Sequence, residues 1–233
     1  RELDCVFSTG YRGPIFLVDD NFIGHRSEVV KLLMAVRQWQ EAKDFPFSFF
    51  TSTSIDLAAE NEILDLMVHS GFYMVFLGLE TPDENTLNAI NKGQNIKHNM
   101  YDSIKIIQRR GLEVTAGLII VFDTDTDDIF DRQIKFIQQD AIPMAMIGLM
   151  VALPATRLTR RLEEEGRMLY ESGGNNTTMF ALNYIPVMDV DKIISGYKRV
   201  LKTIYSHGLY FERSLKLLSR KPRTSYKRGR LQK

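Results

Sequence analysis

The sequence is poor in cysteine and in long hydrophobic runs, and each shortage excludes a class of protein. Cys5 is the only cysteine among 233 residues, so no disulfide can form within the chain, which favours the reducing cytoplasm. No apolar run approaches the roughly 18–20 residues of a membrane span. The first residues, Arg1–Asp4, have neither the apolar core nor the cleavage site of a signal peptide. Because they are typical of a helix already under way, we expect the N-terminus of the protein to lie upstream.

Common catalytic motifs are also missing. The four histidines, at 25, 69, 98 and 207, are not spaced as metal ligands. The sequence contains no Gly-x-Ser-x-Gly nucleophile motif and no phosphate-binding P-loop, and residues 1–13 lack a dinucleotide-binding glycine pattern. These absences exclude the commonest hydrolase and nucleotide-binding classes.

The net charge is close to neutral, but the basic residues are unevenly distributed. A formal charge of +1 gives the molecule no strong attraction to nucleic acid, so no nucleic-acid partner is expected. From Lys216 to Lys233 the chain nevertheless carries eight basic and no acidic residues. Such a tail is usually solvated, and this is the favoured interpretation. Contact with a phosphate-bearing or acidic partner is the alternative.

Short apolar runs alternate with amphipathic segments along most of the chain. The runs over residues 15–18, 45–50, 74–77, 114–121 and 145–151 are typical of buried strands. Helices are expected after them, over residues 27–40, 55–70, 84–90 with 99–110, 127–139 and 158–166. This α/β alternation predicts five strand–helix units and a parallel sheet.

Polar residues follow every predicted strand. They are Asp19 with Asp20, Thr51 with Thr53, Glu80, Asp123 with Asp125, and Pro154 with Thr156. A barrel builds its active site from the carboxyl ends of several strands, whereas an open sheet concentrates its ligand at one switch point. The pattern therefore favours a partial (β/α) TIM-like barrel, with Asp20, Glu80 and Asp123 on a common rim.

The composition changes after Met168. Residues 172–178 are typical of a flexible loop, residues 179–185 of an extended stretch, and residues 190–205 of a helix. We expect residues 1–168 to form the barrel and residues 169–233 to form a mostly helical extension packed on it, with a basic tail from about residue 216.

Three features of the strand ends have more than one interpretation. The carboxylates of Asp19 and Asp20, with Asn21, suit an ammonium group or a divalent cation, but such residues also make ordinary turns. Glu80 either binds a ligand or caps the next helix. Gly117, inside a strand, allows close approach of either a ligand or a neighbouring element.

The string Phe16–Gly24 resembles the second-strand segment of radical S-adenosylmethionine (SAM) proteins that carry an N-terminal cobalamin-binding domain. Further similar segments follow in the family's order, at 76–82, 91–95, 117–125, 150–156, 165–167, 196–197, 204–205 and 210–213. The segment at 76–82 contains the Gly-x-Glu-Thr pattern of the family's fourth strand. The resemblance depends on the order and spacing of these segments and covers nearly the whole chain.

This resemblance implies a function for the full-length protein. Such enzymes hold a 4Fe-4S cluster on a Cys-x3-Cys-x2-Cys loop after their first strand and cleave SAM reductively to a 5′-deoxyadenosyl radical. The resemblance implies cobalamin-assisted methylation, or a related modification, of a small-molecule substrate. It also implies an upstream cobalamin domain and an electron donor such as flavodoxin or ferredoxin. It does not specify the substrate.

The resemblance also implies which residues bind SAM. Asp19, Asp20 and Asn21 match the segment that receives the methionine ammonium, which can only donate hydrogen bonds. Thr51, Thr53 and Glu80 would reach the ribose hydroxyls or the methionine. Around the adenine we expect Gly117 and Ile119, with Phe122 and Asp123 beyond them, and backbone contacts from Leu153 and Pro154.

Two departures from the family pattern affect these expectations. The cluster cysteines are absent, and Cys5 lies in the helix after their usual place, so we expect the chain as given to be inactive. Position 121 is Val where the family usually has Gly, and a β-branched side chain hinders close backbone approach.

Two other functions remain open at this stage. A degenerate barrel could serve as a non-catalytic binding module, which would agree with the missing cysteines. Alternatively, Asp19, Asp20 and Glu80 could be oxygen ligands of a barrel enzyme that depends on a divalent metal.

Overall fold

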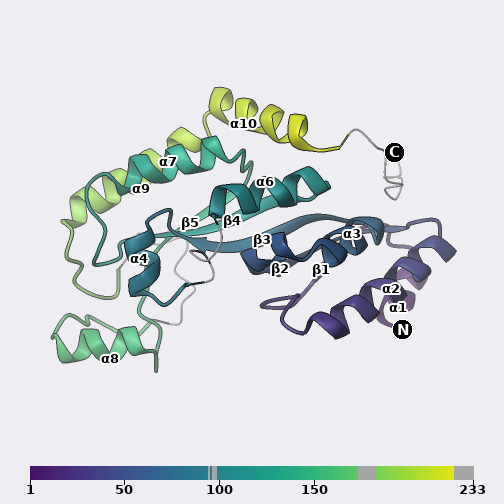
Figure 1. The fold of residues 1–233 in the computed structure, drawn as a ribbon. Coiled ribbons are helices and arrows are strands. Elements are labelled where there is room, and N and C mark those ends of the chain that lie inside the picture. Colours follow the sequence, from purple (N-terminus) through teal and green to yellow (C-terminus); the bar gives the residue numbers. More distant parts are fainter. Residues whose placement is uncertain (94, 96–98, 173–181, 223–233) are drawn as a thin grey trace.

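Five parallel strands form one curled sheet. The computed structural model describes residues 1–93, 95, 99–172 and 182–222. The strands are β1 (Gly13–Leu17), β2 (Phe47–Thr53), β3 (Phe72–Glu80), β4 (Glu113–Ile120) and β5 (Ala145–Leu149). Their order in the sheet is their order in the chain, and each neighbouring pair is parallel. A doubly wound sheet would reverse this order at a switch point. The prediction of a partial barrel is therefore confirmed, as a half-barrel (Figure 1).

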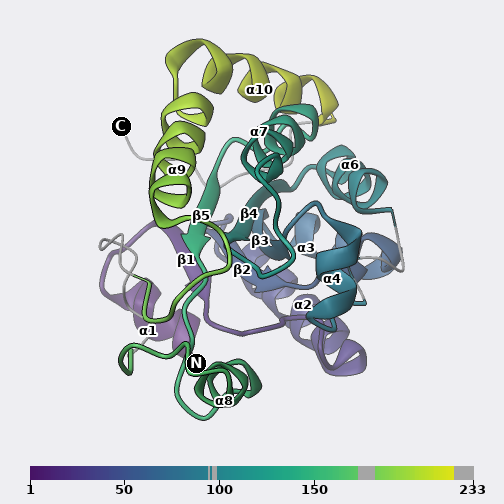
Figure 2. The same cartoon turned by 90° about the vertical axis from the view of Figure 1, so that its left-hand side faces the viewer.

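Helices cover the outer, convex side of the sheet. They are α2 (Arg26–Ala42), α3 (Asn61–His69) with the 3₁₀ helix η1 (Ile55–Ala59), α6 (Met100–Arg110) and α7 (Ile129–Gln139). The short helices α1 (Glu2–Ser8), α4 (Glu84–Ala89) and α8 (Arg157–Glu164) lie at the ends of the sheet (Figure 2). Buried residues alternate along β2, with Phe47 and Phe49 facing the helices, which is the period expected of a strand.

The element boundaries differ from the sequence expectation in two informative places. β2 extends through Thr53, so Thr51 and Thr53 lie inside the strand rather than after it, and Thr51 pairs with Leu17 of β1. The single helix expected over residues 55–70 is instead two, because the backbone at Glu60 (φ −99°, ψ 72°) is not helical. The amphipathic pattern of residues 55–70 is continuous across Glu60, so the pattern alone did not indicate that the helix breaks there.

The C-terminal helices lie over α7 and β5. α9 (Val190–Ile204) packs against α7, and the Tyr197 hydroxyl donates to the Ile147 carbonyl of β5 (2.9 Å). α10 (His207–Arg220) follows on the outermost layer. The division of the chain at residue 168 stays a prediction.

Some expectations fall wholly or partly outside the described residues. The loop at 172–178, the extended stretch at 179–185, the segment at 91–95, His98 and the basic tail are of this kind. Within the described part, Tyr184 forms an antiparallel bridge with Met168. No helix in the described part is both long enough and apolar enough to cross a membrane.

Candidate functional site at the carboxyl ends of the strands

The concave face of the half-barrel is lined by alternate strand residues that do not face the helices. Phe16 of β1 is 43% exposed and stacks on Phe50 of β2, with ring centroids 4.8 Å apart and planes 11° apart. Phe76 and Gly78 continue the same side along β3, in register with Thr115 and Gly117 of β4. This face therefore combines aromatic rings with glycine residues.

Gly78 and Gly117 are register partners in adjacent strands. A Cβ atom at Gly117 would lie 2.7 Å from Cζ of Phe76, so the Phe76 ring already occupies the space above this glycine. A Cβ atom at Gly148 of β5 would meet no atom within 4 Å. The sequence left open whether Gly117 accommodates a ligand or a neighbour. Phe76 is one such neighbour, and it is the open space at Gly148 that leaves room for a flat ligand.

Glu80 ends β3 in an unusual backbone conformation. Its φ is +64°, and the register with β4 shifts between Gly78 and Glu80, as in a β-bulge. The carboxylate turns back over Gly78, where a Cβ atom would lie 3.1 Å from Oε1, and it pairs with Lys92 (2.9 Å). An unfavourable backbone conformation of this kind persists where contacts with the surrounding structure hold it in place. Here the buried Asn95 side chain donates to the carbonyls of Gly78 and Leu79.

Asp19, Asp20 and Asn21 lie exposed after β1. Asn21 has a local role, because its side-chain oxygen accepts from the Ser54 backbone N–H (3.0 Å) and so joins this loop to the end of β2. The Asp19 carboxylate accepts from the Asn21 backbone N–H (2.8 Å). Among the described residues, Asp20 has no hydrogen-bond or ion-pair partner, which leaves its carboxylate available to a ligand.

Thr51 and Thr53 are buried on the side of β2 that faces the helices. Thr51 Oγ1 donates to the Leu17 carbonyl (2.9 Å), which helps to join β2 to β1. Because side chains alternate along a strand, the Ser52 side chain lies on the concave face of the sheet instead. Counting the period of two from Phe47 and Phe49 would have indicated Ser52 from the sequence.

Asp123, after β4, is already occupied by two arginines. Arg167 donates to both of its oxygens (2.7 and 3.0 Å), and Arg161 of α8 lies 2.8 Å away. The hydrogen bonds from Arg167 hold the pKa of Asp123 below its usual range, against the effect of partial burial. Arg167 is 44 positions away in the chain, so no local pattern identifies it. The carboxylate of Asp123 therefore anchors the rim to α8 and the segment behind it.

The backbone between β4 and Asp123 is strained at Val121. Its φ is +84°, a region that favours glycine. The Asp125 carboxylate accepts from the N–H groups of Val121 (2.8 Å) and Phe122 (3.0 Å), and the Tyr184 hydroxyl donates to the Val121 carbonyl (2.9 Å). Burial raises the pKa of Asp125 to about 6. The Val121 side chain is only 2% exposed, so this departure from the family pattern is accommodated in the core.

The remaining predicted residues lie around the ends of β4 and β5. Ile119 is half-buried, and its carbonyl accepts from Gln133 (3.0 Å). Leu153 and Pro154 are exposed. The Leu153 carbonyl accepts from the hydroxyls of Thr156 and Thr159, so it is already used within the protein.

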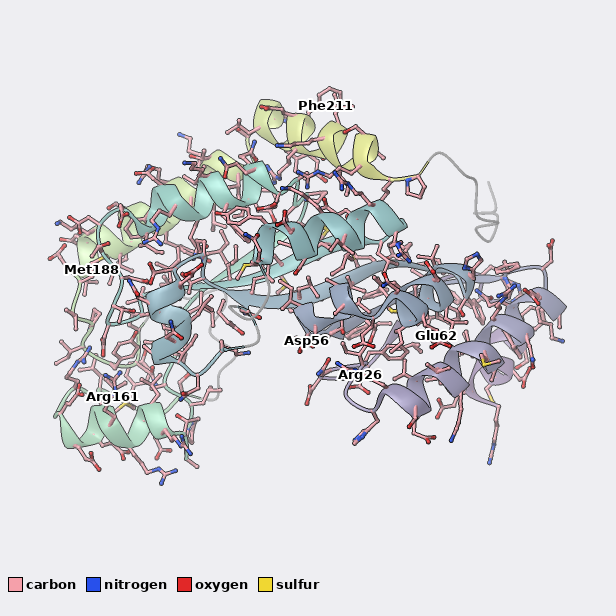
Figure 3. All side chains as sticks on the ribbon, in the orientation of Figure 1. Arg26, Asp56, Glu62, Arg161, Met188 and Phe211 are labelled. Atoms are coloured by element: carbon pink, nitrogen blue, oxygen red, sulfur yellow. The ribbon has the colours of Figure 1, made fainter. Side chains whose placement is uncertain are left out.

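Two cavities open near these strand ends. One, of about 530 Å³, is mostly apolar and lies between α4, the ends of β4 and β5, and α8. Its lining consists of Ala89, Ile90, Asn91, Phe122, Asp123, Thr124, Met150, Arg157, Leu158 and Arg161. The other, also about 530 Å³, is polar and lies beyond β1 and β2. Arg26 and Asp56, labelled in Figure 3, belong to its lining.

Among the residues that the structure describes, none are grouped in a way that suits a metal centre. Cys5 is the only cysteine in the sequence and lies exposed in α1, whereas a 4Fe-4S cluster requires several thiolates. In the described part of the chain, no three His, Cys, Asp or Glu side chains gather as a metal site. The hypothesis of a divalent-metal site at Asp19, Asp20 and Glu80 therefore gains no support.

Comparison with known proteins finds relatives that align with nearly the whole chain. An uncharacterized methyltransferase of Synechocystis sp. (sll1242) is 40% identical over 231 residues, which is 97% of this chain and 43% of the relative. The hopanoid C-2 methylase of Rhodopseudomonas palustris is 33% identical over 204 residues, which is 88% of this chain and 38% of that enzyme. Residues 156–232 match a family model described as "Domain of unknown function (DUF4070)".

A solved structure shares the fold. The radical SAM methyltransferase TsrM from Kitasatospora setae, solved with cobalamin and a 4Fe-4S cluster bound, aligns with 74% of this chain and 32% of its own, with a TM-score of 0.60 at 14% identity. The chain spans about two fifths of the length of the curated relatives it matches. By sequence, this chain is homologous to part of two methyltransferases, that of Synechocystis and the hopanoid C-2 methylase, and by fold it resembles part of a radical SAM methyltransferase solved with cobalamin bound.

Proposed function

We propose that this chain is the SAM-binding half-barrel of a cytoplasmic, cobalamin-dependent radical SAM methyltransferase that modifies a small molecule. The observation that carries the proposal is the concave face, where Gly148 of β5 leaves open space over the backbone and the Glu80 carboxylate lies over Gly78. A flat, polar ligand such as an adenosyl group requires both features: close approach to backbone, and acceptors for its hydroxyl groups.

Residues of the rim provide hydrogen-bond acceptors for both the methionine ammonium and the ribose hydroxyls of SAM. The carboxylates of Asp19 and Asp20 accept from the methionine ammonium, with Asp20 free to do so and Asn21 holding the loop in place. Glu80, oriented by Lys92, accepts from the ribose hydroxyls. In this proposal Ser52 replaces Thr51 and Thr53, because its side chain takes the concave side.

The adenine is proposed to lie beside Gly117, whose surface the Phe76 ring covers, and Ile119, toward Phe122 and the exposed loop of Leu153 and Pro154. Asp123 is a positioning residue in this arrangement. Its carboxylate fixes the rim through Arg161 and Arg167 rather than touching the ligand.

The cofactors of the whole enzyme supply the chemistry, and the protein binds, orients and protects them. When bound, SAM and a 4Fe-4S cluster supply a 5′-deoxyadenosyl radical after reduction by a flavodoxin or ferredoxin, and cobalamin supplies a methyl group. With Cys5 as its single cysteine, the chain depends on residues outside it for the cluster ligands. Its own contribution is to bind SAM.

The apolar cavity beside α8 supports the proposal that the substrate is a small, largely apolar molecule. It has about 530 Å³ of space, lined by apolar residues such as Ile90, Phe122 and Met150, and its polar lining is Asn91, Asp123, Thr124, Arg157 and Arg161. Pockets of this size and composition are typical of sites for small molecules.

Calorimetric titration with S-adenosylhomocysteine tests the proposal without the cluster. We expect saturable binding to the purified chain. Replacing Glu80 with Gln removes the charge of the acceptor at the centre of the site, and we expect an affinity loss of about tenfold, because hydrogen bonds to charged groups contribute about 1.5–3 kcal/mol. The matched control is Glu84→Gln, an exposed carboxylate in α4, which should bind like the wild type.

Three results would contradict the proposal. They are the absence of saturable heat with S-adenosylhomocysteine, equal losses for Glu80→Gln and Glu84→Gln, and binding that survives Gly148→Leu, which fills open space on the concave face. Circular dichroism of each variant separates lost binding from lost folding.

A further inference from the structure

The apolar cavity beside α8, which we call the α8 cavity, has apolar walls and a cationic side. α4 and α8 lie at the same end of the sheet (Figure 1). Phe122 and Met150, both buried, belong to the apolar lining. α8 contributes Arg157, Leu158 and Arg161 to the lining, and their spacing of one and then three residues puts them on one side of the helix. A ligand here can bury an apolar body beside guanidinium groups.

The charge of Arg161 is compensated within the protein. Its guanidinium lies 2.8 Å from Asp123 and 3.7 Å from Glu165 (Figure 3). Arg167 pairs with the same two carboxylates, at 2.7 Å from Asp123 and 2.8 Å from Glu165. Two arginines and two carboxylates therefore form one network whose charges balance. This network leaves no net charge for a ligand to neutralise.

Arg157 differs from Arg161 in this respect. It is exposed, and in the described part of the chain its guanidinium has no hydrogen-bond or ion-pair partner. The side-chain amide of Asn91, which follows α4 and also lines the α8 cavity, likewise has no partner among the described residues. Thr124, another polar lining residue, already bonds to Thr86 (2.7 Å). The α8 cavity thus holds one uncompensated positive charge with hydrogen-bond donors.

This combination selects one kind of ligand. A guanidinium only donates hydrogen bonds, and its planar fork matches a carboxylate through two parallel bonds. Apolar walls around a few polar groups are typical of sites that bury the body of a small molecule. A neutral apolar molecule would leave the charge of Arg157 without a partner. A polyanion such as a nucleotide would place further charges against the apolar walls and near the carboxylate of Asp123.

We propose that the α8 cavity binds an amphipathic anion, that is, an apolar molecule carrying a single carboxylate. The carboxylate pairs with Arg157, and the apolar body lies against Phe122 and Met150. This inference rests on the proposed function, in which the α8 cavity is the substrate site, and it gives that substrate a chemical class.

Calorimetric titration of the whole chain with three probes of equal length tests the inference. The probes are octanoate, 1-octanol and octylammonium, which differ in the charge of the head group. We expect saturable binding of octanoate, binding of 1-octanol that is about tenfold weaker, and the weakest binding for octylammonium. The reason is that a hydrogen bond to a charged group contributes about tenfold or more in affinity.

Two substitutions locate the probe. Arg157→Gln should lower the affinity for octanoate about tenfold and leave that for 1-octanol unchanged, because only the charge pairing is lost. The matched control is Arg160→Gln, an exposed arginine of the same helix that is not among the described lining residues. It should bind octanoate like the wild type. Ala89→Phe, at an exposed lining position, fills the α8 cavity and should weaken the binding of both octanoate and 1-octanol.

Several outcomes would overturn the inference. They are equal affinities of the wild type for octanoate and 1-octanol, equal losses for Arg157→Gln and Arg160→Gln, and octanoate binding that Ala89→Phe leaves unchanged. Thermal melts without probe check that each variant is folded. Titration of the wild type with S-adenosylhomocysteine separates this inference from the proposed function. If octanoate binds as expected and S-adenosylhomocysteine does not, the proposed function fails and the ligand class of the cavity stands. The reverse pattern overturns the ligand class alone.

Discussion

At the scale of single residues, the end of β4 holds an energetically unfavourable arrangement in place. Val121 adopts a φ of +84°, which costs on the order of 1–3 kcal/mol for a residue other than glycine. The Asp125 carboxylate offsets part of this cost, because it accepts from the N–H groups of Val121 and Phe122. Strain of this kind is concentrated where a backbone must be oriented precisely, which agrees with the place of this turn beside the proposed adenine position.

The coupling between Asp125 and Val121 is measurable. We expect Asp125→Ala to lower the free energy of unfolding by about 2 kcal/mol, since it leaves two backbone donors without an acceptor. In a Val121→Gly background the loss should be smaller, because glycine adopts this conformation without help. Urea denaturation of the four proteins gives the coupling energy, and equal losses in both backgrounds would contradict the account.

Asp140, at the end of α7, makes stability depend on pH. It is fully buried with no partner for either side-chain oxygen among the described residues, and burial raises its pKa to about 7. A carboxyl whose pKa is raised on folding stabilises the native state below its unfolded pKa, near 3.8, and this stabilisation is lost as the pH rises through about 7.

We therefore expect Asp140→Asn to be more stable than the wild type at about pH 8, by on the order of 2 kcal/mol, and nearly equal to it at about pH 4. Thermal denaturation across this range measures the difference. Asp191→Asn, at an exposed carboxylate of α9 that is not among the charges acting on Asp140, is the control and should leave the pH dependence of stability due to Asp140 unchanged. A constant difference across the range would mean that Asp140 does not titrate as described.

At the scale of elements, the contact between α7 and α9 depends on a glycine. A Cβ atom at Gly196 of α9 would lie 2.5 Å from the Phe130 ring of α7, so the two helices approach closely at this point. Helix interiors otherwise disfavour glycine, and this contact explains why the sequence has one there. The sequence predicted that α9 is an amphipathic helix, but it did not predict that α9 packs against α7.

Matched substitutions test this contact. Gly196→Ala should destabilise the protein by about 1–3 kcal/mol, since it overpacks the α7–α9 contact. Gly208→Ala, in α10 where a Cβ atom meets nothing within 4 Å, should be neutral or stabilising by up to about 1 kcal/mol. Chemical denaturation compares the two variants, and a loss of the same size for both would show that close packing is not the cause.

At the scale of the whole molecule, the C-terminal helices contribute to the same core as the sheet. Ile193, Val200 and Ile204 of α9 are fully buried and belong to one hydrophobic cluster with the strands. The sequence suggested a division at residue 168 from a change of composition. These contacts suggest that the extension does not fold independently of the barrel.

Truncation tests that division directly. A chain ending at Met188 lacks α9 and α10 and exposes the apolar surface of α7 and β5, so we expect it to lose cooperative unfolding. A chain ending at Pro222 keeps all the described core and should retain the melting temperature of the full chain. If the shorter chain melted cooperatively at the same temperature, the barrel would be an independent domain.

The sequence by itself determined the strand–helix alternation, the parallel sheet and the polar residues at the strand ends, because hydrophobic periodicity and turn residues are local signals. Only the tertiary structure decided which of those residues face the site. Ser52 rather than Thr51 takes the concave side, Glu80 pairs with Lys92, and Asp123 is held by Arg161 and Arg167. The pairings of Glu80 and Asp123 depend on partners distant in the chain that no local pattern identifies, and the side taken by Ser52 depends on β2 extending through Thr53, beyond the strand that the sequence predicted.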